Sequence, residues 1–152
     1  MSTAQTVGDI RDAVAAVNDP EFPGVTIEDL GILRDVRVGA DGTVVDLVPT
    51  FLGCPALGVI ADDVAAAARA AGARAVSVRF VNDPPWSPDL ITPAGRRLLA
   101  EEFTVAVTGP AFVTCPLCGS VTVEERSPFG PTACRAIAYC ESCRNPLEVM
   151  RG

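Results

Sequence analysis

Six cysteines dominate the chemistry that this 152-residue sequence can perform, because the chain contains no histidine. They are Cys54, Cys115, Cys118, Cys134, Cys140 and Cys143. The absence of histidine excludes Ser-His-Asp and Cys-His nucleophilic sites, and it excludes metal sites that depend on imidazole. Any chemistry of this chain must therefore use sulfur and carboxylate groups.

Four of the cysteines form two C-x-x-C turns near the C-terminus. Cys115 pairs with Cys118 and Cys140 with Cys143, and 21 residues separate the turns. This spacing is typical of a zinc ribbon, since each short spacer lets two thiolates face one ion. We predict a closed, structural Zn²⁺ site that supplies folding energy which a segment of about 40 residues cannot obtain from its own core. A redox dithiol or bound iron is the alternative.

Cys54 stands apart from the ribbon and is followed by Pro55, which suits the first position of a helix. That placement puts the thiol at the helix cap, where amide hydrogens and the helix dipole favour a thiolate. Cys54 is therefore a candidate ligand or nucleophile, with a small buried apolar side chain as the equally weighted alternative. Cys134 has three interpretations: a packed ribbon cysteine, a substitute ribbon ligand, or a thiol facing Cys54.

Acidic and aromatic side chains give weaker indications of a metal or cofactor site. Glu21, Glu28 and Asp29 crowd one loop, where carboxylates can bind metal or cap turns, although solvated loop acids are about three times commoner. Trp86 among prolines is more often a core or interface anchor than a platform for a cofactor. We therefore interpret these residues as structural.

The periodicity of apolar residues predicts the elements that position the cysteines. We expect a helix over residues 7–17, where Thr6 and Asp9 offer an N-cap and an acidic first turn, and an ordered loop over 19–29. A hairpin of strands 32–38 and 43–48, joined by a glycine-bearing turn at 39–42, should follow, then a helix from Pro55 to Gly72 and a strand over 76–80. Because a helix separates the second and third strands, they should run parallel. The predicted fold class is α+β: a small mixed three-stranded sheet with helices packed on one face, followed by a β-rich zinc ribbon.

The second half of the chain contains a short predicted helix from Thr92-Pro93 to about residue 100 and then a fading pattern over 103–113 that indicates a linker. Ribbon strands are expected at 121–124 and 136–139. We place the boundary near Gly109-Pro110, which divides the chain into an α+β domain at 1–109 and a four-cysteine ribbon at 110–152.

Composition restricts the setting in which this chain works. A formal net charge of −7 disfavours binding to phosphate backbones and anionic lipid, so nucleic acid is a poor candidate partner. Residues 1–10 show no signal-peptide pattern, and charges interrupt the Ala/Val-rich stretch 61–75, so no membrane span is predicted. Six cysteines without a signal sequence indicate a reducing compartment, and we expect a cytoplasmic protein.

The order of motifs resembles that of a known family. These motifs are Asp19-Pro20-Glu21-Phe22-Pro23, Ile27-Glu28-Asp29-Leu30-Gly31-Ile32, Thr50-Phe51-Leu52-Gly53-Cys54-Pro55, Trp86, and Ile91-Thr92-Pro93-Ala94-Gly95. Together, over about residues 7–102, they are similar to the metal-sulfur cluster biosynthetic domain family, which includes SufT and the cytosolic iron-sulfur targeting factors. The runs at 115–119, 129–136 and 140–144 resemble the zinc ribbon of the PaaD family of phenylacetate-degradation proteins.

The resemblance implies a bacterial accessory protein of the phenylacetyl-CoA ring epoxidase that matures or loads its metal centres. It places the family's Thr-x-x-Gly-Cys-Pro cysteine on Cys54 and the Zn²⁺ ligands on Cys115, Cys118, Cys140 and Cys143. The sequence departs from the family at Phe22, where an aliphatic residue is expected, and at residues 147–150, where aromatic residues are usual. Both departures concern packing or partner choice more than the cysteines.

Our leading hypothesis is a maturation factor in which Cys54, alone or with Cys134, transiently holds iron or an iron-sulfur cluster while the ribbon docks the client. The expected partners are epoxidase subunits, their ferredoxin-type reductase, and a second copy of the chain sharing a cluster. The main alternative is a structural subunit that binds only zinc. A Cys54 enzyme lacks a histidine base, and a nucleic-acid-binding ribbon conflicts with the acidic charge.

Overall fold

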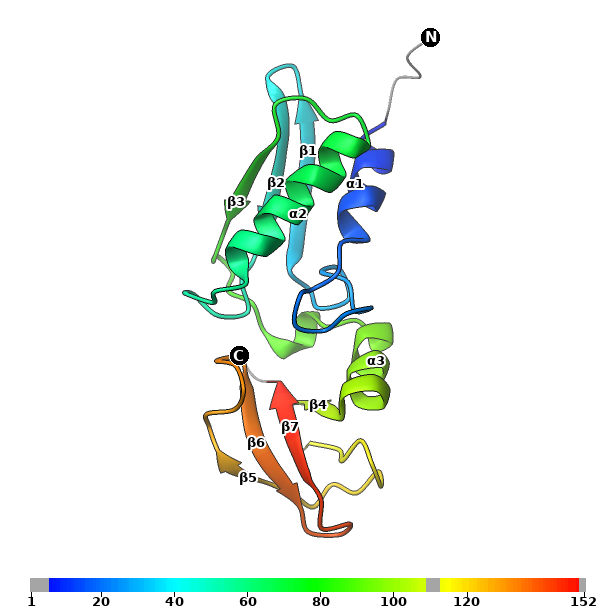
Figure 1. Ribbon diagram of the computed structural model, residues 1–152, viewed down its shortest axis with the longest axis vertical. Helices are drawn as coiled ribbons and strands as arrows, with labels where there is room; N and C mark the ends of the chain where they lie inside the picture. The colour runs from blue at the N-terminus through cyan, green and yellow to red at the C-terminus, as the bar shows by residue number, and fades with distance from the viewer. Residues whose placement is uncertain (1–5, 109–112, 151–152) are drawn as a thin grey trace.

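The computed structural model describes residues 6–108 and 113–150, and it contains two sheets that follow one another along the longest axis (Figure 1). The N-terminal sheet contains β1 (Leu33–Gly39), β2 (Gly42–Leu47) and β3 (Ser77–Phe80) in the order β1-β2-β3. Helices α1 (Val7–Ala15) and α2 (Leu57–Ala70) cover one face of it. The predicted α+β class, with a mixed three-stranded sheet and helices on one face, is confirmed.

Local sequence explains how these elements begin and pair. Thr6 caps α1 by accepting the N–H of Asp9, whose carboxylate in turn accepts the N–H of Thr6. Strands β1 and β2 pair antiparallel and close at Gly39 and Gly42, as the turn signal predicted. The crossover through α2 makes β3 parallel to β2, so this part of the topology also agrees with the prediction.

The loop between α1 and β1 is held by backbone bonds and by the segment before α3. Trp86 is buried and donates its Nε1–H to the carbonyl of Leu30 at 2.7 Å, which confirms the core-anchor interpretation. Asp29 accepts the Thr92 hydroxyl at 2.9 Å, and a Cβ at Gly95 would lie 2.6 Å from the Asp29 carbonyl oxygen. The loop that carries Asp29 therefore packs directly against the start of α3, where the Thr-Pro-Ala-Gly motif lies.

Helix α3 (Pro93–Phe103) begins where Thr92 caps it, preceded by the 3₁₀ turn η1 (Pro88–Leu90). It leads directly into β4 (Val105–Val107), so the predicted linker over 103–113 is wrong in its first part. The alternating Val105-Ala106-Val107 run is too short to stand out in sequence, and it becomes a strand because β7 offers a free edge. The predicted boundary at 109–110 lies outside the described residues.

The second sheet has the order β4-β7-β6-β5 and forms the ribbon. Its further strands are β5 (Val123–Ser127), β6 (Arg135–Cys140) and β7 (Pro146–Met150). Strand β6 covers the predicted 136–139, β5 begins two residues later than predicted, and β7 was not predicted. The β-rich character of the C-terminal part is confirmed.

One apolar core joins the two sheets. Cys134 and Met150 from the ribbon belong to the same buried cluster as Phe22, Ile32 and Leu99. The division into 1–109 and 110–152 stays a prediction, and the shared core means that the ribbon is packed against the N-terminal part. Within the described residues, no helix is long and apolar enough to cross a membrane.

Candidate metal sites

The ribbon brings its four cysteines together at one end of the second sheet. The sulfur of Cys115 lies 3.8 Å from that of Cys143, and the sulfur of Cys118 lies 3.6 Å from that of Cys140. All four ligand atoms lie within 4.8 Å of one another. A tetrahedron with metal–sulfur bonds of about 2.3 Å has sulfur–sulfur edges of about 3.8 Å, so the donor set fits one tetrahedral ion.

Matching backbone turns shape the two halves of this cluster. The N–H of Gly119 donates to the carbonyl of Cys115, and the N–H of Arg144 donates to that of Cys140, at 2.9 and 2.8 Å. Gly119 and Arg144 both have positive φ, of 76° and 60°. The left-handed residue after each second cysteine turns the chain back, so that both thiols of a turn face the same point.

The thiols of the ribbon differ sharply in their protonation. Burial raises the pKa of Cys115 to about 11, whereas hydrogen bonding by Asn145 lowers the pKa of Cys143 to about 6. Binding of a metal requires thiolates, so an ion must displace the proton that Cys115 otherwise keeps. When zinc is bound, these four sulfurs hold it and leave no open coordination position.

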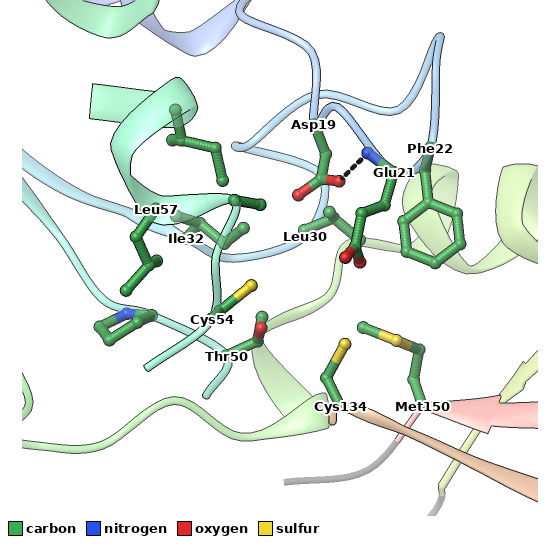
Figure 2. Close-up of a pocket in the computed structure, with 13 residues that line it drawn as sticks. Asp19, Glu21, Phe22, Leu30, Ile32, Thr50, Cys54, Leu57, Cys134 and Met150 are labelled. Carbon is green, nitrogen blue, oxygen red and sulfur yellow. Dashed lines mark hydrogen bonds between the residues drawn. The ribbon is translucent and has the colours of Figure 1, made fainter. Parts of the chain in front are cut away.

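A second group of sulfurs lies at the junction of the two sheets, where Figure 2 shows a crevice lined by 13 residues. Cys54 reaches it from the loop before α2, and Cys134 and Met150 reach it from the adjoining ends of β6 and β7. The three sulfur atoms and the carboxylate of Glu21 turn toward the same space. Cys134 lies outside the four-cysteine cluster, and it is both packed in the core and at the same crevice as Cys54.

The environment of Cys54 differs from the predicted helix cap. Helix α2 begins at Leu57 with Ala56 as its cap, so Pro55 is not the first helical residue and Cys54 lies two residues before the cap. Burial raises the pKa of the half-buried Cys54 thiol, and a hydrogen bond from the Ala56 N–H only partly opposes this. The expected stabilised thiolate is therefore wrong for this state, because Phe51 to Ala56 form a turn instead of helix.

Two carboxylates lie beside the thiols of the crevice. Asp19 is buried, and its Oδ1 accepts the N–H of Glu21 at 2.7 Å, which fixes the loop after α1. Burial raises the pKa of both Asp19 and Glu21, and the Asp19 charge adds to the rise at Glu21. Of the three acids considered in sequence, only Glu21 lines the crevice, whereas Glu28 pairs with Arg11 and Asp29 with Thr92.

Arg135 is the cation that balances these acids. Its guanidinium lies 4.0 Å from a Glu21 oxygen, pairs with Glu148 at 2.6 Å, and stacks over the Phe22 ring at 4.7 Å. It belongs to β6, immediately after Cys134. Arg135 therefore ties the ribbon to the loop that carries Asp19 and Glu21.

The crevice is narrow, with a cavity volume of about 10 Å³. That is close to the smallest space that holds a single water molecule. The crevice in this state accommodates one ion or water, and its walls must move before a larger group can enter.

Models of two protein families match the two parts of the chain. The iron-sulfur cluster assembly protein family matches residues 8–80, and the PaaD zinc beta ribbon domain matches residues 101–151. Over 152 aligned residues the sequence is 36% identical to a putative 1,2-phenylacetyl-CoA epoxidase subunit of Escherichia coli, covering 95% of this chain and 92% of that one. The chain belongs to the PaaD family.

Other relatives of this PaaD-family chain match its N-terminal part. An Fe-S protein maturation auxiliary factor of Porphyromonas gingivalis is 37% identical over 90 residues, which cover 58% of this chain and 85% of the relative. The crystal structure of a domain of unknown function from Bacillus anthracis has a TM-score of 0.56 and 29% identity, covering 62% of this chain and 91% of that chain. The α+β fold thus occurs without a ribbon, and the PaaD family adds one.

Sequence reasoning missed the role of three residues that lie in or beside the crevice. Asp19 was noted only as part of a motif, Met150 only as a departure from the family, and Arg135 only as part of a ribbon run. The available signal for Arg135 was its neighbour Cys134. A cysteine that belongs to neither C-x-x-C turn hints at a second site, so the residues next to it deserved inspection. The pairing of β6 with β7 brings Met150 to the crevice, and no local sequence pattern predicts that pairing.

Proposed function

We propose that this chain is an accessory maturation factor for a phenylacetyl-CoA ring epoxidase in aerobic phenylacetate catabolism. It handles iron or an iron-sulfur cluster through Cys54, and its ribbon, closed by Zn²⁺ on Cys115, Cys118, Cys140 and Cys143, docks the client. The proposed partners are epoxidase subunits or their ferredoxin-type reductase, and the proposed setting is the cytoplasm.

The observation that carries this proposal is the position of Cys54. It lies at a crevice walled on one side by the part that resembles iron-sulfur assembly proteins and on the other by the PaaD ribbon. The name of the Escherichia coli relative supports the epoxidase as client, and that of the Porphyromonas gingivalis relative supports iron-sulfur maturation. A thiol at this junction could bind iron or a cluster while the ribbon contacts the client protein.

Exposed apolar side chains flank both cysteines and support client docking. Phe51 and Leu52 precede Cys54 and are 47% and 63% exposed, and Phe129 in the loop before Cys134 is 82% exposed. The two loops lie on the same side of the molecule (Figure 1). Large exposed apolar groups on one side of a molecule are typical of a surface that meets another protein.

A second candidate function is a structural subunit of the oxygenase complex that binds only zinc. The raised pKa of Cys54 and the narrowness of the crevice favour it, since a buried protonated thiol can serve packing alone. The two candidates differ in one respect: only the maturation factor needs the Cys54 sulfur.

The test uses cells that lack the chain and produce the epoxidase and its reductase. They receive the wild type, Cys54→Ala, or Val59→Ala as a control at an exposed side chain of the following helix, at matched protein levels. We expect Cys54→Ala to lower epoxidase activity and the iron content of the purified client at least about tenfold, as loss of a metal ligand would. Full activity with Cys54→Ala would leave the structural subunit as the function.

A further inference from the structure

We propose that the crevice is a single-ion site assembled from both parts of the chain, with Cys54 and Glu21 from the N-terminal part and Cys134 from the ribbon as ligands. Its cargo is one divalent transition-metal ion, with Fe²⁺ as the physiological case, and not a preformed cluster. This inference rests on the proposed function and specifies what that site carries.

The ligand types determine the class of ion. Two thiols and two carboxylates line the crevice, and the thioether of Met150 lies on the same wall. Sulfur ligands select borderline and soft transition metals, whereas Ca²⁺ and Mg²⁺ require oxygen ligands throughout. Histidine plays no part in such a site, which agrees with its absence from this sequence.

Electrostatics also favours a cation in the crevice. Cys54, Cys134, Asp19 and Glu21 lie around one small space, and the negative charges of Glu21 and Asp19 both act on Cys54. Arg135 faces Asp19 and Glu21 from the ribbon, but its short 2.6 Å ion pair is with Glu148. Glu21 can therefore leave Arg135 for a metal ion without leaving that guanidinium unpaired.

Size separates a single ion from a cluster. Even a [2Fe–2S] cluster contains four heavy atoms, whereas the cavity of about 10 Å³ has room for one water-sized body. Phe22, Leu30 and Ile32 form a fully packed wall behind the crevice. An ion fits after small side-chain rotations, whereas a cluster requires the ribbon to separate from the shared core.

The ligand atoms of the crevice are more widely spaced than those of the ribbon. Among residues 6–108 and 113–150, only the four ribbon cysteines bring three or more such ligand atoms within 4.8 Å of one another. The crevice ligands must therefore close on an ion, and that rearrangement lowers affinity. A site of this kind suits delivery of metal more than storage.

Binding is a proton exchange without redox chemistry. The Cys54 and Cys134 thiols each lose a proton to water as sulfur–metal bonds form, and Glu21 adds a carboxylate oxygen. A water or a group of the client takes the remaining position. Transfer reverses these steps: client ligands replace the sulfurs, which regain protons from solvent.

Cobalt provides a direct probe of sulfur ligation. The full chain, first loaded with zinc in the ribbon, is titrated anaerobically with Co²⁺, and thiolate-to-cobalt charge-transfer and visible d–d bands are followed. Released zinc is measured throughout to exclude exchange in the ribbon. We expect one Co²⁺ per chain beyond the zinc, with no change of oligomeric state in size-exclusion chromatography.

Variants assign the ligands. Cys54→Ser and Cys134→Ser should each lower the intensity of the charge-transfer band by about half and weaken binding at least about tenfold, as loss of a ligand requires. Glu21→Gln should weaken binding but keep the sulfur bands, and Glu28→Gln, an exposed acid of the same loop, should change nothing. Melting temperatures confirm that each variant is folded.

Two results of the cobalt titration would overturn the single-ion site: no Co²⁺ binding beyond the zinc, or wild-type binding by Cys134→Ser. Neither affects the epoxidase assay of Cys54→Ala, which decides the proposed function separately. If that variant abolishes maturation while Co²⁺ does not bind, Cys54 acts in maturation without this site. Binding of a chemically reconstituted cluster at Cys54 without loss of ribbon packing would also contradict the single ion.

Discussion

The ribbon cluster and the crevice both use cysteine sulfur, but the fold assembles them to different degrees. Four ribbon sulfurs already lie within 4.8 Å of one another, held by two matching backbone turns. The crevice instead surrounds a cavity of about 10 Å³ with two thiols and two carboxylates that come from three separate loops. A preassembled site suits a permanent ion, whereas a site that must close suits an ion in transit.

The two sites are also mechanically connected. Strand β6 begins immediately after Cys134 and ends at Cys140, and β7 runs from shortly after Cys143 to Met150. Six residues of strand span about 20 Å, so the sites are far apart yet share the same two strands. A metal ion bound by the ribbon would therefore support the second wall of the crevice as well as the ribbon itself.

The largest expected effect comes from breaking the ribbon site. Cys140→Ser removes a buried thiolate from a closed set, and structural zinc provides about 10–16 kcal/mol of apparent folding energy in isolated fingers. We expect loss of zinc, unfolding of the ribbon, and alkylation of Cys134, which is otherwise buried. Metal analysis and mass spectrometry after alkylation measure these changes. Cys134→Ser is the control that should keep its zinc, and protection of Cys134 without zinc would refute the connection.

A smaller effect is expected from removing the contact between the two parts. Arg135→Met leaves Glu148, Glu21 and Asp19 without their cation and should lower the free energy of unfolding by about 2 kcal/mol. Arg126→Met is the matched control, because Arg126 also pairs with acids and stacks on Tyr139 but is half exposed. Its cost should stay within about 0.5 kcal/mol. Equal losses for the two variants in urea denaturation would contradict the role of Arg135.

Replacing Phe22 tests the packing behind the crevice. This fully buried ring meets Phe103 edge to face at 5.1 Å between ring centres, and Arg135 stacks on it. Phe22→Leu keeps an apolar group but loses both ring contacts, so we expect a loss of about 1 kcal/mol. Phe129→Leu, on a ring that is 82% exposed, should leave stability unchanged. Calorimetry compares the two, and an unchanged melting temperature for Phe22→Leu would show that the ring contacts add nothing.

The smallest stability effect belongs to Cys54. The side chain is half-buried at the edge of the crevice, so Cys54→Ala should change the free energy of unfolding by less than about 1 kcal/mol and leave the ribbon zinc in place. Denaturation and zinc analysis of the purified variant test this. A loss of zinc, or a stability loss near that of Arg135→Met, would mean that Cys54 is a structural residue.

Sequence predicted the elements that have strong local signals. The Thr6 cap, the turn at Gly39 to Gly42 and the cap at Thr92 are each encoded within a few residues, and each lies where expected. The C-x-x-C turns were also predictable, because two cysteines at that spacing can face one ion whatever surrounds them. Short-range sequence rules therefore predict caps and turns, whose geometry depends on a few neighbouring residues.

Prediction failed where geometry depends on distant contacts. Strands β4 and β7 are short, and they form because each satisfies the other's backbone groups across more than 40 residues of sequence. The start of α2 was misplaced because Pro55 fits either a turn or a first helical turn. The crevice itself is a product of tertiary packing, so Cys134 could be suspected from sequence but its direction could not be derived.

The most direct test of the contrast between the two sites is the content of zinc, iron and acid-labile sulfide per chain after anaerobic purification. Wild type, Cys54→Ala and Cys134→Ser are measured side by side. We predict about one zinc in all three, as a single closed ribbon site requires, with iron only in the wild type and little sulfide. Equal iron in wild type and Cys54→Ala, or loss of zinc from Cys54→Ala, would contradict this contrast.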